Sequence, residues 1–155
     1  MLNRKIERVF DRFLSDSRKS ALLITGARQV GKTFSVRKFG REHFESFVEL
    51  NFIKDKEARE VFENAADEKD VLLRLSAVAN GRLVPGRTLI FLDEVQKCPE
   101  AVTYIKFLVE EGSYRYVLSG SLLGVELKNV RSVPVGYMSE AEMYPLDFEE
   151  FLEAN

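Results

Sequence analysis

The chain has 155 residues, of which 45% are hydrophobic and 31% charged, and its formal net charge is −2. A chain of this size and composition buries a core without disulfides or a structural metal, which excludes disordered and fibrous classes. The charge provides no excess for coating a nucleic acid, so such a partner stays open but is not indicated. No segment approaches the roughly 20 apolar residues of a membrane-spanning helix, so we expect no membrane partner. The single cysteine, Cys98, excludes an internal disulfide and favours a cytoplasmic location.

The first part of the chain alternates between helical and extended patterns. Residues 2–14 place apolar side chains three to four positions apart, which predicts an amphipathic helix. An unbroken apolar run at residues 20–25 is typical of a strand buried on both faces of a parallel sheet. Residues 32–39 contain no helix breaker and are predicted to form a helix that ends at Gly40.

The same alternation continues to the end of the chain. Further strands are predicted at residues 47–52, 88–92 and 116–118, with a short one between 135 and 143, and further helices at 56–64, 69–80 and 102–109, the last ended by Gly112. Strands that alternate with helices predict an α/β fold, a three-layer αβα sandwich with a mainly parallel sheet. An apolar helix begins after Pro145 and stops almost at once, so we expect a fragment of a longer chain.

Residues 26–33 match a complete phosphate-binding motif. They read Gly-Ala-Arg-Gln-Val-Gly-Lys-Thr, the pattern G-x-x-x-x-G-K-[ST] between an apolar strand and a helix. The backbone N–H groups of such a P-loop surround the β-phosphate, and the helix that follows adds the positive end of its dipole. Lys32 is predicted to lie between the β- and γ-phosphates, and the Thr33 hydroxyl is predicted to ligate Mg²⁺. The predicted nucleotide-binding residues are Gly26, Ala27, Arg28, Gln29, Val30, Gly31, Lys32, Thr33 and Phe34.

Two acids follow the apolar run at residues 88–92. Ligands bind outside the carboxyl ends of the strands in open α/β sheets, so Asp93 and Glu94 are predicted to lie beside the phosphates. Asp93 is predicted to hold Mg²⁺, and Glu94 to orient and deprotonate the water that attacks the γ-phosphate. A strand end capped by solvated acids is the alternative interpretation of this pair.

The strand at residues 116–118 leads into two hydroxyl groups. Ser119 or Ser121 is predicted to hydrogen-bond the γ-phosphate or the attacking water, the alternative being an ordinary Gly/Ser turn. Arg28, Arg115 and Arg131 could each supply charge for the transition state, in the same chain or from a neighbouring subunit, and we single out Arg131. The alternative for each is an ordinary surface arginine.

Four segments in this order resemble one family. The segments are residues 23–33, residues 89–96 (Leu-Ile-Phe-Leu-Asp-Glu-Val-Gln), residues 117–121 (Val-Leu-Ser-Gly-Ser) and residues 143–152 (Met-Tyr-Pro-Leu-Asp-Phe-Glu-Glu-Phe-Leu). They resemble the AAA-type ATPases of bacteria and archaea that carry a DUF4143 region after the ATPase core. The resemblance implies strand order 5-1-4-3-2, ATP or ADP with Mg²⁺ as ligands, and the site roles given above. Many of those ATPases carry Gly-Arg where this chain has Gly136-Tyr137, which leaves the arginine finger unassigned there.

The predicted organisation is one ATPase domain over residues 1–155. Residues 1–17 form an N-terminal helix, 18–145 the nucleotide-binding core, and 146–155 the start of a helix that leads to a missing C-terminal region. That region, the nucleotide and a second copy in a homo-oligomer are the expected partners.

Several functions compete on these residues. The leading hypothesis is Mg²⁺-dependent ATP hydrolysis that is coupled to movement of the missing region. A binding switch without hydrolysis is the alternative, and Glu94 argues against it because a switch needs no water activator. A small-molecule or nucleotide kinase would need a basic lid, and a GTPase an Asn-Lys-x-Asp segment, neither of which we find in the sequence.

Overall fold

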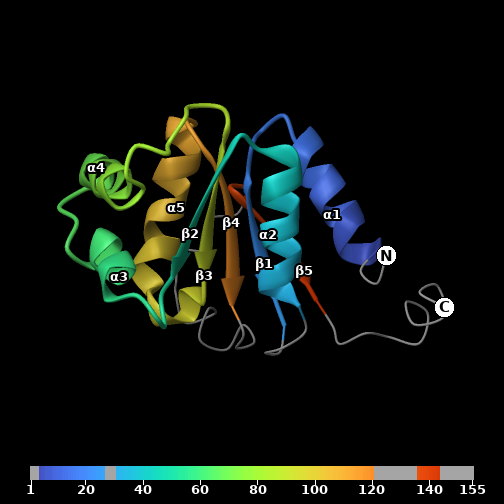
Figure 1. The fold of residues 1–155 in the computed structure, drawn as a ribbon, viewed down its shortest axis with the longest axis horizontal. Helices are drawn as coiled ribbons and strands as arrows, with labels where there is room; N and C mark the ends of the chain where they lie inside the picture. Colours follow the sequence, from blue (N-terminus) through green and yellow to red (C-terminus); the bar gives the residue numbers. More distant parts are fainter. Residues whose placement is uncertain (1–3, 27–30, 121–135, 144–155) are drawn as a thin grey trace.

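The structure is a computed structural model that describes residues 4–26, 31–120 and 136–143 (Figure 1). Its helices are α1 (Arg4–Ser15), α2 (Lys32–His43), α3 (Lys56–Glu63), α4 (Glu68–Val78) and α5 (Pro99–Glu111), with a 3-10 turn η1 (Val95–Lys97). Its strands are β1 (Ala21–Thr25), β2 (Ser46–Asn51), β3 (Thr88–Asp93), β4 (Arg115–Gly120) and β5 (Met138–Glu142). Within these ranges, no helix has the length and apolar character needed to cross a membrane.

The strands form one parallel sheet in the order β2-β3-β4-β1-β5. This is the predicted order 5-1-4-3-2 viewed from the other edge, so the predicted topology is confirmed. Because all neighbouring strands are parallel, all five strands end at the same edge of the sheet, and crossover connections join them. That edge is where an open α/β sheet presents its ligand-binding loops.

Different helices cover the two faces of the sheet and complete three layers (Figure 1). Successive side chains of a strand point to opposite faces. One set of strand residues packs against α1 and α2, namely Leu22, Ile24, Leu89, Phe91 and Val117. The alternate set packs against α3, α4 and α5, namely Ala21, Leu23, Val48, Leu50, Ile90, Leu92, Tyr116 and Leu118. The predicted αβα sandwich is therefore confirmed, with a hydrophobic core on each side of the sheet.

Helix α2 runs through Gly40 to His43, so the predicted end at Gly40 is wrong. A Cβ atom at Gly40 would lie 2.3 Å from Cδ1 of Phe47 on β2. The glycine thus serves the close approach of α2 to β2, and this contact is invisible to the local pattern that suggested a helix end. At Gly112 the prediction is confirmed, because that residue ends α5 with a left-handed φ of 81°.

Candidate active site

The two glycines of the predicted P-loop have different conformational reasons to be glycine. Gly26 follows β1 with φ 146°, and a Cβ there would lie 2.3 Å from the carbonyl oxygen of Met143, just after β5. Gly31 precedes α2 with φ 89° and ψ 15°, a left-handed conformation. The predicted ligands between them, Ala27, Arg28, Gln29 and Val30, lie outside the described residues.

Lys32 and Thr33 open α2 at the edge where the strands end. Lys32 is only 6% exposed, and its Nζ donates a hydrogen bond to the Gly26 carbonyl oxygen at 3.0 Å. Its ammonium therefore lies at the first residue of the loop that it is predicted to serve. The Thr33 hydroxyl donates to Asp93 Oδ2 at 3.1 Å, which joins α2 to the end of β3. The first turn of α2 and the acid-bearing strand thus meet at one point.

Three polar side chains end neighbouring strands in one row across the sheet. The register pairs Asn51 of β2 with Asp93 of β3, and Asp93 with Ser119 of β4. Phe91 and Val117, two residues earlier on β3 and β4, pack toward α2, so the period of a strand directs Asp93 and Ser119 to the same face. The row therefore faces Thr33, and Asn51 is a member that our sequence reading did not identify.

Asp93 is a buried carboxylate with room for a cation. It is 3% exposed, and its Oδ1 has no hydrogen-bond partner within the described part of the chain. Asn51 Nδ2 approaches Oδ2 at 3.4 Å, which is a weak contact. Burial raises the pKa of Asp93 most, the Thr33 hydrogen bond opposes this, and the charges of Glu94 and Glu49 add to the rise. An oxygen set with an unpaired buried carboxylate atom fits Mg²⁺, so Thr33 and Asp93 can hold the ion as predicted.

Glu94 is held in an unusual backbone conformation directly after β3. Its φ of 62° and ψ of 49° are left-handed, which costs a non-glycine residue about 1–2 kcal/mol. Its carboxylate accepts a hydrogen bond from Gln96 Nε2 in the turn that follows. Backbone strain of this kind persists where the surrounding structure holds the residue, often at functional sites. Gln96 was not identified from the sequence, because nothing in the spacing distinguishes it from a solvated turn residue.

Ser119 lies fully buried in the row, and its hydroxyl has no hydrogen-bond partner in the described ranges. The Ser119 hydroxyl is close enough to Asp93 to lower the pKa of that carboxyl, by less than the Thr33 hydroxyl does. The geometry between Ser119 and Asp93 nevertheless falls short of a hydrogen bond. A buried unpaired hydroxyl costs free energy unless something else contacts it, which favours Ser119 as a ligand contact. The other predicted residues, Ser121 and Arg131, lie outside the described residues.

A cavity of about 450 Å³ lies at the carboxyl edge of the sheet beside these groups. It is lined by Gly31, Lys32, Thr33, Phe34, Arg37, Asn51, Ile53, Lys54, Asp93 and Glu94. The structure therefore brings together the described P-loop residues with both predicted acids. A polar residue at the end of a predicted strand was a usable signal for Asn51, whereas Arg37 resembled a solvated helix residue.

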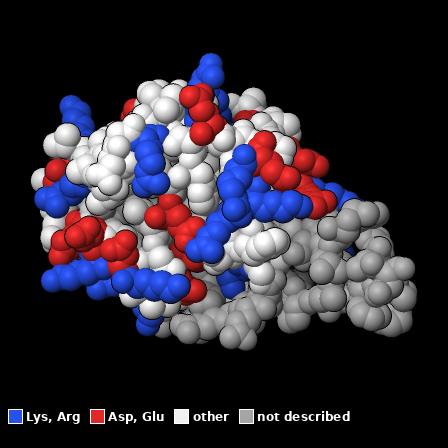
Figure 2. All heavy atoms as spheres, in the orientation of Figure 1, with Lys and Arg blue, Asp and Glu red and all other residues white. Residues whose placement is uncertain are grey.

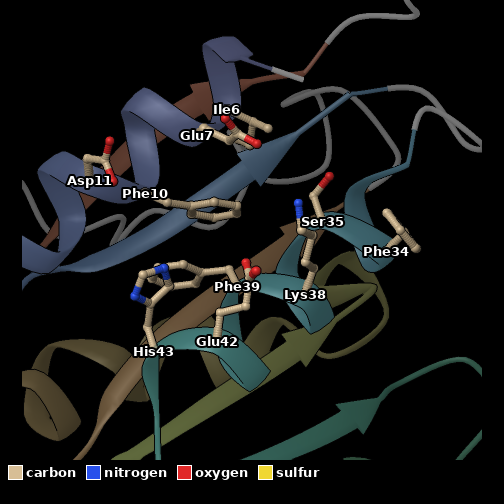
Figure 3. Close-up of a pocket in the computed structure, with 10 residues that line it drawn as sticks. All are labelled: Ile6, Glu7, Phe10, Asp11, Phe34, Ser35, Lys38, Phe39, Glu42 and His43. Carbon is tan, nitrogen blue, oxygen red and sulfur yellow. The ribbon is translucent and has the colours of Figure 1, made fainter. Parts of the chain in front are cut away.

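Phe34 also lines a second cavity of about 440 Å³, which lies between α1 and α2 (Figure 3). The floor of this cavity is aromatic, because the rings of Phe10 and Phe39 stack at a centroid distance of 4.3 Å. Polar groups such as Glu7 and Lys38 lie at its border. Phe34 itself is 66% exposed and lines both cavities.

Arg115 is not at this site. It begins β4, four residues before Ser119, and so lies roughly 13 Å away along the strand at the amino edge of the sheet. Its guanidinium carbon lies 3.9 Å from the Phe13 ring centroid, and Nη2 donates to the Phe13 carbonyl oxygen at 2.7 Å. Arg115 therefore attaches α1 to the sheet, and its suggested role at the transition state of the same chain is wrong. The other suggested arginine, Arg28, lies outside the described residues.

Cys98 is a neutral structural thiol. The residue is buried, and burial raises the pKa of its thiol to about 12. A thiolate is thus strongly disfavoured near neutral pH, and nucleophilic or redox chemistry at this position is not supported.

Comparison with known proteins identifies a family. The sequence model of the AAA domain family matches residues 18–152. Among curated proteins, no sequence matches the chain.

Solved structures share the fold at low sequence identity. A chain of the Drosophila ORC structure bound to DNA has a TM-score of 0.58 at 12% identity, with 97% of both chains covered. A chain of Drosophila ORC bound to AT-rich DNA and Cdc6 has a TM-score of 0.56 at 14% identity, covering 96% of this chain and 58% of that one. C. elegans PCH-2 has a TM-score of 0.50 at 12% identity, covering 94% of this chain. The chain spans only 40% of the length of the PCH-2 chain, so these likenesses describe a fold.

Proposed function

Because the chain belongs to the AAA domain family, we propose that it binds ATP together with Mg²⁺ and hydrolyses the terminal phosphate. The hydrogen bond between Thr33 and Asp93 carries this proposal. It brings the hydroxyl at the start of α2 and the carboxylate at the end of β3 to within 3.1 Å, close enough to serve one ion. A strand end capped by solvated acids would leave Asp93 exposed, whereas it is buried.

The roles follow from the contacts of each side chain. Lys32 exchanges the Gly26 carbonyl for phosphate oxygens, and Thr33 and Asp93 hold the ion. Bound Mg²⁺ supplies positive charge that stabilises the transferring phosphate. Glu94 orients and deprotonates the attacking water, while Gln96 keeps its carboxylate in place. Ser119 donates its free hydroxyl to the γ-phosphate or the water.

We further propose that the domain binds ATP in preference to GTP, with the base beside Phe34. Phosphates held at the start of α2 leave two directions for the nucleoside. The cavity at the strand ends is lined by charged side chains of both signs, whereas the cavity between α1 and α2 contains the stacked rings of Phe10 and Phe39, which suit a planar base. Comparing protection of the domain against heat by ADP and GDP in the presence of Mg²⁺ tests the choice of base.

Hydrolysis is further proposed to move a C-terminal region of the DUF4143 type, in a cytoplasmic protein. Its arginine finger then comes from outside the described residues or from a second copy in a homo-oligomer. The Drosophila ORC structures are of complexes with DNA. A nucleic acid is not part of our proposal, because the net charge is −2 and the face in Figure 2 shows positive and negative side chains interspersed.

The substitution Glu94→Gln tests hydrolysis directly. We expect ATP turnover to fall by roughly a hundredfold or more, because general base catalysis typically contributes that much, while ATP binding is retained. Turnover is measured by phosphate release at saturating ATP and Mg²⁺, and binding by calorimetry. Glu57→Gln, which removes an exposed carboxylate from α3, is the matched control and should leave turnover unchanged.

Equal and negligible turnover by the wild type and Glu94→Gln, with tight ATP binding by both, would support the binding switch instead. A longer chain containing the C-terminal region should be measured in parallel. This separates an inactive site from one that only lacks its arginine.

A further inference from the structure

Arg37 lies on the nucleotide-facing side of α2, one helical turn beyond Thr33. Residues four apart in a helix lie on the same face, and helical side chains lean toward the N-terminus. The Arg37 side chain therefore leans toward the end of α2 where the phosphates bind. It lines the same cavity as Lys32, Thr33, Asp93 and Glu94.

The guanidinium of Arg37 is held by Glu49 of β2. Nε donates to Oε1 at 2.7 Å, and Nη2 donates to Oε2 at 2.7 Å, a two-pronged charge-assisted contact. Glu49 lies two residues before Asn51, so its side chain is on the same face of the sheet as the row of Asn51, Asp93 and Ser119. The ion pair therefore lies directly behind the row that is proposed to hold the metal.

The pair is accessible and adjustable. The side chain of Arg37 is 47% exposed and that of Glu49 is 20% exposed. A partly solvated ion pair contributes little to the stability of the fold, so exchanging the partner of Arg37 costs little. A terminal phosphate carries more charge than one carboxylate and accepts the same planar fork of N–H groups.

We propose that Arg37 is a further nucleotide-binding residue, which contacts the terminal phosphate of ATP and thereby distinguishes ATP from ADP, with Glu49 as its competing partner. This inference rests on the proposed function. The Arg37 guanidinium would be a positive charge from α2 of the same chain at the third phosphate. It is distinct from any arginine that a neighbouring chain supplies. The Glu49 carboxylate competes with the terminal phosphate for the same N–H groups of the guanidinium.

The test compares affinities for ADP and for the β,γ-imido analogue of ATP, both with Mg²⁺, by calorimetry. Arg37→Gln should weaken binding of the analogue by about tenfold, the loss of roughly one charge-assisted hydrogen bond, and binding of ADP less than about twofold. Glu49→Gln should act in the opposite direction and raise the preference for the analogue, because it removes the competitor. Arg37→Lys should fall between the wild type and Arg37→Gln.

Arg41→Gln is the matched control, since Arg41 follows one turn later and its Nε donates to the Arg37 carbonyl oxygen. Its affinity ratio should equal that of the wild type. An unchanged ratio in Arg37→Gln, or a lowered ratio in Glu49→Gln, would overturn the inference and leave the proposed function intact. If Arg37→Gln does not fold, Arg37→Lys and Glu49→Gln decide the matter. If the wild type binds neither nucleotide, both the inference and the proposed function fail.

Discussion

A buried ammonium needs compensation, and Lys32 illustrates how a nucleotide-free P-loop can provide it. Burial of an unpaired charge is costly, but the Gly26 carbonyl accepts from Nζ and keeps the side chain at the loop. Under the proposed function, the same nitrogen exchanges this carbonyl oxygen for phosphate oxygens.

Replacing Lys32 by alanine should abolish measurable ATP binding while the domain stays folded. The ammonium is the charge closest to the predicted phosphate position, and its removal also eliminates a buried charge that burdens the fold. Binding is measured by calorimetry, and folding by circular dichroism and thermal unfolding. Arg41→Ala removes one exposed positive charge from the same helix and should retain binding. Tight ATP binding by a folded Lys32→Ala domain would contradict the role assigned to this residue.

At the scale of elements, α2 is the piece on which the site depends. Its first turn carries Lys32 and Thr33, its next turn carries Arg37, and Gly40 lets it approach β2 closely. Helix α1 lies beside it through the stacked rings of Phe10 and Phe39, and Arg115 attaches the other end of α1 to β4. The position of α2 is therefore set from both sides, by an aromatic contact and by a glycine.

Gly40→Ala should destabilise the domain, although alanine is the better helix former by about 1 kcal/mol. The added Cβ would lie 2.3 Å from the Phe47 ring, so that ring or the helix must move. We expect a lower temperature of unfolding, measured by calorimetry in the absence of nucleotide. Combining Gly40→Ala with Phe47→Leu removes the ring and should recover much of the loss. A more stable Gly40→Ala single variant would show that the close approach is unimportant.

At the scale of the whole molecule, the ionised Asp93 side chain is a cost to the nucleotide-free fold. Its pKa is raised in the folded state, chiefly by burial, above the value of 3.8 expected for an unperturbed aspartate. A raised pKa means that the folded state binds the proton more tightly than the unfolded state does. The contribution of Asp93 to the free energy of unfolding is fully present when the pH is below the pKa of the unfolded state. It is lost as the pH rises through the pKa of the folded state.

Asp93→Asn should therefore stabilise the nucleotide-free domain at pH 7, by about 2–4 °C in unfolding temperature for each kcal/mol recovered. The advantage over the wild type should shrink as the pH falls through the raised folded-state pKa of Asp93, because the side chain then becomes neutral in the folded domain. Thermal unfolding at several pH values measures both effects. Adding ADP with Mg²⁺ should stabilise the wild type and not Asp93→Asn. An Asp93→Asn domain less stable than the wild type at pH 7 would contradict a cost of ionisation at this position.

Features confined to one segment could be predicted from the order of residues alone. The two P-loop glycines, Gly26 and Gly31, were predicted from the sequence, as were the two acids after β3. The alternation of strands and helices was also predicted, and the αβα sandwich that it implies is confirmed. These features depend on neighbouring residues, whose geometry is limited by backbone sterics and by the periods of helix and strand. The resemblance to a family supplied the strand order, which spacing could not.

Features that join distant segments were settled only in three dimensions. Strand register places Asn51 beside Asp93, and Arg37 of α2 pairs with Glu49 of β2. Arg115 lies at the amino edge of the sheet, away from the carboxyl edge where the site lies. Gly40 lies inside a helix because a ring from β2 occupies the space beside it. Contacts of this kind depend on how layers pack and on which strand lies beside which, and local patterns carry little information about either.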